Sequence, residues 1–193
     1  MNFIYGLIKR HDLGYKSRIN RSKRILDPIL SQIDINKSVL EIGAGSCDIT
    51  HYLTKNKFEV IPVDIQDISF FTKIKPILYD GKKLPFSDKR FGTSLLITVL
   101  HHVDKPEKLL MEASRVSERV IIVEDVYENF IQKCLTYFMD SVINFEFFNH
   151  PRSNKTDTEW KKTFDKLNLK LIYSRRDPFW VVFKSATYVL DNM

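Results

Sequence analysis

The sequence has few cysteines and no long hydrophobic run. Its two cysteines, Cys47 and Cys134, fall in different predicted elements, so a disulfide framework is not expected and a cytoplasmic location is the default prediction. No group of Cys and His residues has the spacing of a metal site. No apolar run approaches the roughly 20 residues that span a bilayer. We therefore expect no metal and no transmembrane segment.

The motifs of two phosphate-binding classes are also missing. No G-K-[ST] triplet is present, which excludes a P-loop. The turn Gly43-Ala44-Gly45 is followed by Asp48 at the position where a dinucleotide fingerprint has glycine or alanine. Because a carboxylate there would face the pyrophosphate, a bound dinucleotide is disfavoured.

The charge of the chain is uneven. The formal net charge is +6, and seven Lys or Arg with a single Asp lie between Lys9 and Arg24. Such a run suits a solvated helix face, an acidic substrate, nucleic acid or an anionic membrane surface. Aromatic residues do not alternate with the basic ones as on a single-strand binding platform, which makes nucleic acid an unlikely partner. Peripheral contact with lipid stays open.

Alternating strand and helix patterns predict one α/β domain over residues 1–193. Residues 1–36 are expected to form an N-terminal helical cap whose two helices are separated at Asp12–Tyr15. Helices are then predicted at Cys47–Lys55 and Pro106–Ser117. The predicted parallel strands are Lys37–Ile42, Phe58–Val63, Ile77–Asp80, Gly92–Val99 and Arg119–Val123.

The pattern changes after the fifth strand. Residues 126–156, rich in Phe and Tyr, are predicted to be a helical insertion, and a helix capped by Thr156 or Asp157 follows. The end of the chain indicates an antiparallel pair of strands at Leu169–Ser174 and Trp180–Val189. The expected fold is a Rossmann-like seven-stranded sheet, mostly parallel, with an antiparallel C-terminal strand pair.

The stretch Val39–Thr50 passes from a strand through two glycines into a helix. Such a turn presents backbone N–H groups and the positive end of a helix dipole, and glycine lets a ligand approach closely. A small, nucleotide-like ligand is therefore predicted.

Three further features follow the turn in order. They are an acid at the end of the second strand, an acid at the end of the third, and a Leu-Pro-Phe run: Asp64, Asp80 and Leu84–Phe86. Together with Glu41-x-Gly43-x-Gly45, they resemble the class I S-adenosylmethionine-dependent methyltransferases, and within them the type 11 group. The resemblance covers Ser38–Glu124 and implies S-adenosyl-L-methionine as cofactor and S-adenosyl-L-homocysteine as product.

Asp64 lies about 20 residues beyond the turn, where an acid meets ribose hydroxyls in dinucleotide folds. The resemblance implies that Asp80 accepts from the adenine amino group, that the backbone of Gly81 contacts the ring and that Ile65 packs on its face. It also implies that Glu41 holds the turn Gly43–Gly45, Ala44 included, and the amino end of the cofactor. Loop capping remains the alternative for Glu41 and Asp80. One departure is Cys47, where the family often has a third glycine.

The methyl acceptor is harder to predict. His101 and His102 follow the fourth strand, at the sheet edge where ligands bind; either is a candidate general base, and His101 is the better candidate for a cofactor neighbour. Glu124 and Asp125 either face the acceptor, bind a basic group on it or cap the helix that follows. Because the N-P-P-Y loop of amino-methylating enzymes and the Pro-Cys nucleophile of cytosine enzymes are missing, a small-molecule acceptor is favoured. RNA methylation and a non-catalytic partner subunit remain alternatives, and the chain is expected to be a monomer or homodimer.

Overall fold

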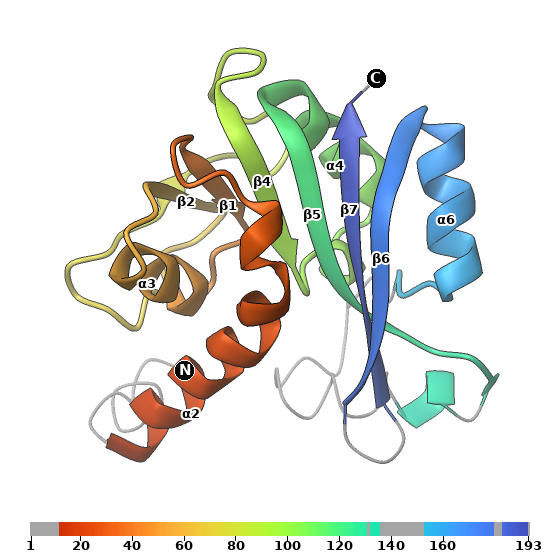
Figure 1. The fold of residues 1–193 in the computed structure, drawn as a ribbon, viewed down its shortest axis with the longest axis horizontal. Coiled ribbons are helices and arrows are strands. Elements are labelled where there is room, and N and C mark those ends of the chain that lie inside the picture. Colours follow the sequence, from red (N-terminus) through yellow and green to blue (C-terminus); the bar gives the residue numbers. More distant parts are fainter. Residues whose placement is uncertain (1–11, 131, 136–152, 180–182, 193) are drawn as a thin grey trace.

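A seven-stranded sheet forms the centre of the molecule (Figure 1). The computed structural model describes residues 12–130, 132–135, 153–179 and 183–192. The strand order is β3-β2-β1-β4-β5-β7-β6; β1 to β5 pair in parallel, and β7 pairs antiparallel with β5 and β6. The strands are β1 (Val39–Ile42), β2 (Val60–Asp64), β3 (Ile77–Leu78), β4 (Phe91–Ile97), β5 (Ser117–Val126), β6 (Leu169–Phe179) and β7 (Phe183–Asn192). The predicted fold class is confirmed.

Helices cover both faces of this sheet. The helical elements are α2 (Asp12–Leu26), the 3₁₀ helix η1 (Asp27–Gln32), α3 (Asp48–Lys55), the 3₁₀ helix η2 (Leu100–His102), α4 (Pro106–Val116) and α6 (Asp157–Lys166). One buried cluster joins the apolar side chains of α4 and α6 to the sheet, and a second joins those of α2, η1 and α3 to it. Three layers result, as the burial of apolar helix stripes on a parallel sheet requires.

The N-terminal cap differs from the prediction at one point. Asp12–Tyr15, expected to separate two helices, is the first turn of α2. Tertiary contacts explain the error, because the Tyr15 hydroxyl lies 3.3 Å from Nε2 of His51 and its ring packs edge-on against Phe71. These contacts oppose the helix penalty of about 1 kcal/mol for Gly14. Residues 1–11 of the predicted cap lie outside the described residues.

The strands at the C-terminal side are longer than predicted. β5 continues to Val126, so the predicted insertion 126–156 does not begin there. The reason is the partner strand, since the β5–β7 register runs from Arg119↔Asp191 to Val126↔Lys184. Gln132–Leu135 is helical, with the side chain of Asn129 accepting from the Gln132 N–H. The remainder of the insertion, residues 136–152, lies outside the described residues.

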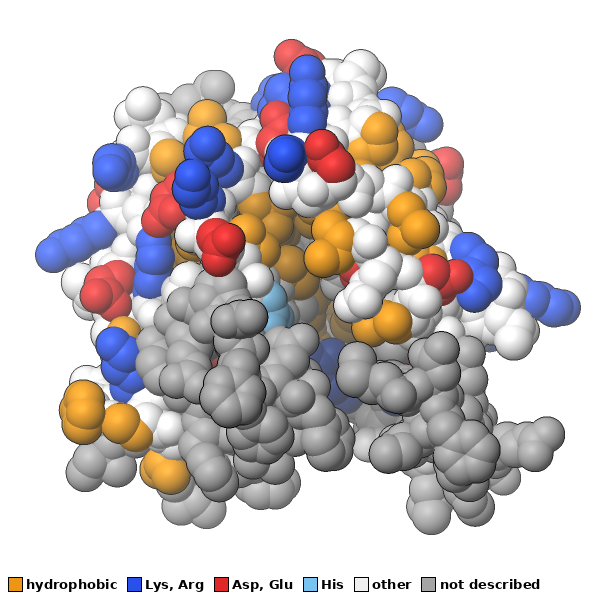
Figure 2. All heavy atoms as spheres, turned by 180° about the vertical axis from the view of Figure 1, so that it is seen from behind, with side chains coloured by type: hydrophobic (Ala, Val, Ile, Leu, Met, Phe, Trp, Pro, Cys, Tyr) orange, Lys and Arg blue, Asp and Glu red, His pale blue; other side chains and the backbone are white. Residues whose placement is uncertain are grey.

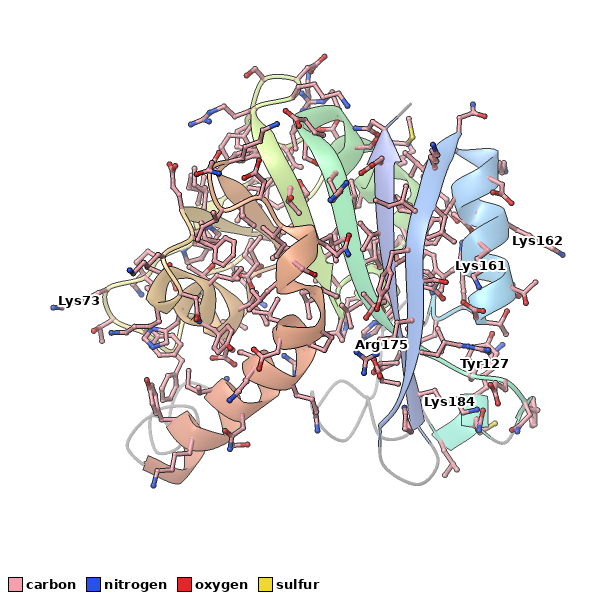
Figure 3. The ribbon with its side chains drawn as sticks, in the orientation of Figure 1. Lys73, Tyr127, Lys161, Lys162, Arg175 and Lys184 are labelled. Carbon is pink, nitrogen blue, oxygen red and sulfur yellow. The ribbon has the colours of Figure 1, made fainter. Side chains whose placement is uncertain are left out.

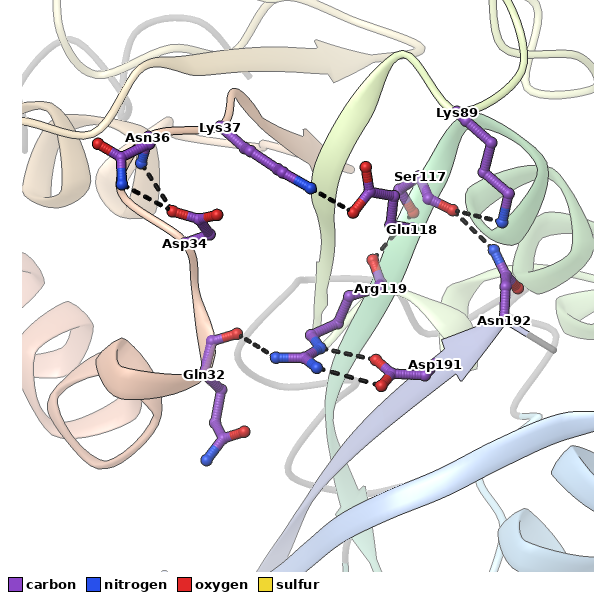
Figure 4. Close-up of polar contacts among 10 residues, drawn as sticks. All are labelled: Gln32, Asp34, Asn36, Lys37, Lys89, Ser117, Glu118, Arg119, Asp191 and Asn192. Atoms are coloured by element: carbon purple, nitrogen blue, oxygen red, sulfur yellow. Dashed lines mark hydrogen bonds and ion pairs between the residues drawn. The ribbon is translucent and has the colours of Figure 1, made fainter.

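A polar network ties the amino ends of the strands to η1 (Figure 4). The guanidinium of Arg119 donates to both carboxylate oxygens of Asp191, at 2.7 and 3.1 Å, and to the carbonyl oxygen of Gln32 at 2.9 Å. Beside it, Nζ of Lys37 lies 2.6 Å from a Glu118 oxygen. We call these five residues the amino-edge network. Because its charged groups are paired with each other, it has the features of a structural element.

Candidate cofactor site

The glycine turn after β1 is shaped by two different constraints. Gly43, with φ +71°, donates to the Val63 carbonyl at 2.9 Å, and a Cβ on it would lie 2.6 Å from a Val99 methyl carbon. Gly45, with φ +50°, has nothing within 4 Å of its Cβ position. Ala44 between them is buried and also donates to Val63. The turn is therefore packed against β2 and β4 on one side and has open room at Gly45.

Asp64, at the end of β2, is hydrogen-bonded to this turn. One carboxylate oxygen accepts from the Gly45 N–H at 2.7 Å, and the other accepts from the N–H groups of Ile65 at 2.7 Å and Gln66 at 3.2 Å. A carboxylate has about four acceptor positions, so one position remains for a ligand hydroxyl. Asp64 thus stabilises the turn in addition to any contact with ribose.

Asp80, Gly81 and Ile65 lie together beyond β3. Asp80 is exposed, and backbone N–H groups of Lys82 and Lys83 donate to it, which lowers the pKa of its carboxyl. Gly81 has φ +74°, and a Cβ on it would lie 3.2 Å from a methyl carbon of Ile65. The side chain of Ile65 is 64% exposed. An exposed apolar residue beside an acceptor carboxylate suits a planar base with an amino group.

Glu41 lies beneath the turn. It is 3% exposed and accepts from the backbone N–H of Thr50 at 2.9 Å and from the Thr50 hydroxyl. Burial raises the pKa of Glu41 to about 8. Its carboxyl group is therefore engaged in joining β1 to α3, which agrees with a role in holding the turn.

Cys47 occupies the position of the family's third glycine, and its backbone adopts a glycine-like conformation. Its φ is 60°, and its N–H donates to the Ala44 carbonyl at 2.7 Å. The side chain is fully buried, and burial raises the pKa of the thiol to about 12. A thiol with this pKa is not a nucleophile near neutral pH. Cys47 is a packing residue that keeps the turn geometry.

His101 and Glu124 form a buried pair at the end of β4. Nδ1 of His101 lies 2.6 Å from one carboxylate oxygen of Glu124, and the other oxygen accepts from the N–H groups of Val99 and Leu100 at 2.8 and 2.7 Å. The carboxylate of Glu124 therefore fixes the β4–η2 turn, and whether Glu124 faces the acceptor stays a prediction. His102 is exposed.

The sequence interpretation missed two arginines. Arg18 and Arg21 of α2, part of the basic run between Lys9 and Arg24, contact residues that follow the glycine turn and β4. Nη1 of Arg18 lies 3.1 Å from Oδ2 of Asp48, and Nη2 of Arg21 donates to the Thr98 hydroxyl at 3.1 Å. The i,i+3 spacing of the two arginines indicated that they share one face of a helix. That spacing does not tell whether this face packs against the rest of the protein or faces solvent.

The predicted residues come together at the carboxyl ends of β1 to β4, where ligands bind in open α/β sheets. Open room at Gly45, acceptor carboxylates at Asp64 and Asp80, and the apolar Ile65 fit an adenosyl group, and carboxylates suit a sulfonium cation. Within the described part of the chain, no three His, Cys, Asp or Glu residues are grouped for a metal ion. No described helix has the length and apolar character needed to cross a membrane.

Comparison with known proteins agrees with this geometry. The type 11 methyltransferase domain family matches residues 40–119. An uncharacterized protein of Methanocaldococcus jannaschii is 30% identical over 109 residues, which are 56% of this chain and 49% of that protein. The ubiquinone/menaquinone biosynthesis C-methyltransferase of Rickettsia prowazekii is 30% identical over 109 residues, 47% of this chain and 44% of that enzyme. The chain thus spans about half the length of the curated relatives it matches.

Solved structures share the fold. A Haloferax volcanii protein in complex with the Trm112 methyltransferase activator has a TM-score of 0.69 at 14% identity, covering 93% of this chain and 94% of that one. The 1,6-didemethyltoxoflavin-N1-methyltransferase of Burkholderia thailandensis, with bound S-adenosylhomocysteine, has a TM-score of 0.63 at 16% identity, covering 91% and 78%.

Residues 40–119 thus match a methyltransferase domain family, and the fold is that of the class I S-adenosylmethionine-dependent methyltransferases. The cofactor of the class is S-adenosyl-L-methionine, with S-adenosyl-L-homocysteine as product.

Proposed function

We propose that this protein transfers a methyl group from S-adenosylmethionine to a small-molecule acceptor. The observation that carries the proposal is the assembly of the glycine turn with Asp64 and Asp80 at one sheet edge, beside the open room at Gly45. When bound, S-adenosylmethionine supplies a methyl group that is open to in-line attack. The protein then has to hold both reactants in line and keep water away.

The residues of the chain divide these tasks. Asp64, Asp80 and Ile65 hold the adenosine part, and the backbone of Gly43, Ala44 and Gly45 shapes the turn beside it. Glu124 holds the turn after β4 and orients the imidazole of His101 by a hydrogen bond to Nδ1. His101, and the exposed His102 next to it, are the groups available to take a proton from an acidic acceptor atom.

Two observations favour a small molecule over RNA. Arg18 and Arg21, in the basic run that suggested nucleic acid, are engaged at the cofactor site. Other basic side chains are dispersed: Lys73 lies at one edge of the molecule and Lys161 and Lys162 at the opposite edge (Figure 3). On the face shown in Figure 2, acidic and basic side chains are interspersed around a central group of hydrophobic side chains beside a histidine. A phosphate backbone needs a continuous basic surface.

Cofactor binding is the first test. Calorimetric titration with S-adenosylhomocysteine is expected to show one site in the wild type and no measurable binding for Asp64→Ala, since that change removes both the ribose acceptor and the support of Gly45. Asp88→Ala, which alters an exposed acid away from the turn, is the matched control and should bind normally. Absence of binding by the wild-type protein, or normal affinity in Asp64→Ala, would contradict the proposed site.

The acceptor class needs a separate test. The protein is incubated with methyl-labelled S-adenosylmethionine and either a small-molecule extract or total RNA. Label in the low-molecular-weight fraction supports the proposal, and label in RNA contradicts it. A third outcome, cofactor binding without transfer to either pool, indicates a non-catalytic partner subunit.

A further inference from the structure

Helix α2 places two arginines near the carboxyl ends of the strands, and each contacts a different element. Arg18 is paired with Asp48 at the start of α3, and its guanidinium carbon lies 4.8 Å from the centre of the Phe70 ring. Arg21 donates from Nη2 to Thr98, directly after β4. Side chains of the helix therefore contact both the start of α3 and the segment after β4.

Asp48 has an unsatisfied carboxylate oxygen. The residue is 6% exposed, and Oδ2 is paired with Arg18, but Oδ1 has no hydrogen-bond partner among the described residues. A buried carboxylate oxygen without a donor costs free energy. A donor from a bound ligand would remove that cost, and an ammonium group is the donor that a carboxylate binds best.

Arg21 supplies the opposite charge next to it. A guanidinium has five N–H donors in a planar fork, and among the described residues the hydrogen bond to Thr98 uses only Nη2. The Arg21 side chain is exposed, so its remaining N–H groups can reach an anionic group of a bound ligand.

The order of the strands indicates which part of a ligand reaches this pair. Asp80 follows β3, Asp64 ends β2, the glycine turn follows β1, and Thr98 follows β4, which is also the spatial order β3-β2-β1-β4. With adenine at Asp80 and ribose at Asp64, the far end of the ligand lies between β1 and β4. Asp48 and Arg21 stand at that place.

We infer that Asp48 and Arg21 bind the amino-acid end of the cofactor, Oδ1 of Asp48 accepting from its α-ammonium and the guanidinium of Arg21 donating to its α-carboxylate. The inference rests on the proposed function. It gives part of the basic run between Lys9 and Arg24 a specific role, and it explains why an acid stands where a dinucleotide site has glycine. Arg18 positions Asp48 through Oδ2.

Two ligands separate this inference from the proposed function. S-adenosylhomocysteine carries the amino-acid end, and 5′-methylthioadenosine has the same adenosine and sulfur without it. Calorimetry is performed with both ligands on the wild type, Asp48→Asn, Arg21→Gln and the matched control Lys23→Gln, an exposed residue of the same helix. We expect each site variant to bind S-adenosylhomocysteine about 10-fold or more weakly, as the loss of a charge-assisted hydrogen bond implies. Affinity for 5′-methylthioadenosine should change less than about twofold, and Lys23→Gln should match the wild type for both ligands.

The outcomes are distinct. A wild-type protein that binds neither ligand contradicts the proposed function. A wild-type protein that binds both, with variants that keep full affinity for S-adenosylhomocysteine, overturns the inference alone. Equal weakening of both ligands in a variant with a native melting curve also overturns it, because the residue would then support the turn in general. Should Asp48→Asn fail to fold, Arg21→Gln decides, since that side chain is exposed and its loss leaves the core unchanged.

Discussion

The two ends of the parallel strands carry polar clusters of similar composition but different completeness. At the amino ends, Arg119 uses three N–H groups on Asp191 and Gln32, and both oxygens of Asp191 are engaged. At the carboxyl ends, counting only partners among the described residues, Arg21 makes one hydrogen bond and Asp48 keeps one buried oxygen without a partner. The amino-edge network is closed, whereas the carboxyl-edge cluster is open.

Whether all donors and acceptors are paired within the protein distinguishes a structural cluster from a binding cluster, and it can be read from this structure alone. A structural ion-pair network gains stability when every donor and acceptor is satisfied internally. A binding site must leave some of them for the ligand, so it carries a cost in the free protein that the ligand removes. Changes at the carboxyl edge should therefore affect binding, and changes at the amino edge should affect stability alone.

The largest effect is expected at Gly43. In Gly43→Val, the new side chain collides with Val99 at 2.6 Å and the φ of +71° is unfavourable for a β-branched residue. We expect S-adenosylhomocysteine binding to fall by about 100-fold or more and stability by about 3 kcal/mol. Calorimetry and urea unfolding measure the two effects. Gly45→Ala is the comparison, since nothing lies within 4 Å of its Cβ position and only backbone strain of about 1 kcal/mol should appear. A stable Gly43→Val protein with normal affinity would refute this account of the turn.

Glu124 should be the next most sensitive position, through stability. Glu124→Ala leaves the N–H groups of Val99 and Leu100 and the imidazole of His101 without their acceptor in a buried place. The expected loss is about 2 to 4 kcal/mol in urea unfolding, since several unsatisfied groups result. Glu128→Ala, an exposed acid further along the chain, should change stability by less than about 0.5 kcal/mol. Equal stability of the two variants would show that Glu124 does not hold the β4–η2 turn.

The site residues that could be located from the sequence are those that directly follow a parallel strand. Gly43, Asp64 and Asp80 are adjacent in space because each follows a parallel strand, and strand ends can be located from apolar runs and turns. The strand order and the clustering of these residues then follow from the rules for βαβ units. The fold and the clustering of these residues at one sheet edge were predictable for this reason.

Partners that depend on tertiary packing were not predictable. Nothing local in the sequence links Arg21 to Thr98, or Glu124 to the backbone of Val99 and Leu100. The start of α2 was missed because Gly14 is a local helix breaker, and the contacts of Tyr15 that offset it come from distant residues. The length of β5 is likewise set by its partner β7.

Glu41 gives a pH-dependent test. Its pKa is about 8 in the folded protein, above the ordinary value of about 4.3 for an exposed Glu. The unfolded chain therefore releases this proton at lower pH than the folded chain, so the contribution of Glu41 to stability falls as the pH rises from about 4.3 through about 8. Glu41→Gln keeps an acceptor oxygen for Thr50 and has no proton to lose. Urea unfolding from pH 5 to 8 should show a decline in the wild type that is about 3 to 4 kcal/mol smaller in Glu41→Gln; parallel pH profiles would exclude a protonated Glu41.

The smallest loss of stability is expected at the amino edge. There, Arg119→Leu can be compared directly with Arg21→Gln at the carboxyl edge. Arg119→Leu removes three hydrogen bonds, but Arg119 and Asp191 are about one third exposed, at 30% and 36%, so solvent screens the ion pair. We expect a loss of about 1 kcal/mol in urea unfolding and unchanged calorimetric affinity for S-adenosylhomocysteine. Arg21→Gln should show the reverse, weaker binding with little change in stability, because its single hydrogen bond to Thr98 contributes little to the fold. Weaker binding in Arg119→Leu, or a stability loss without a binding loss in Arg21→Gln, would mean that the open and closed clusters do not differ in function.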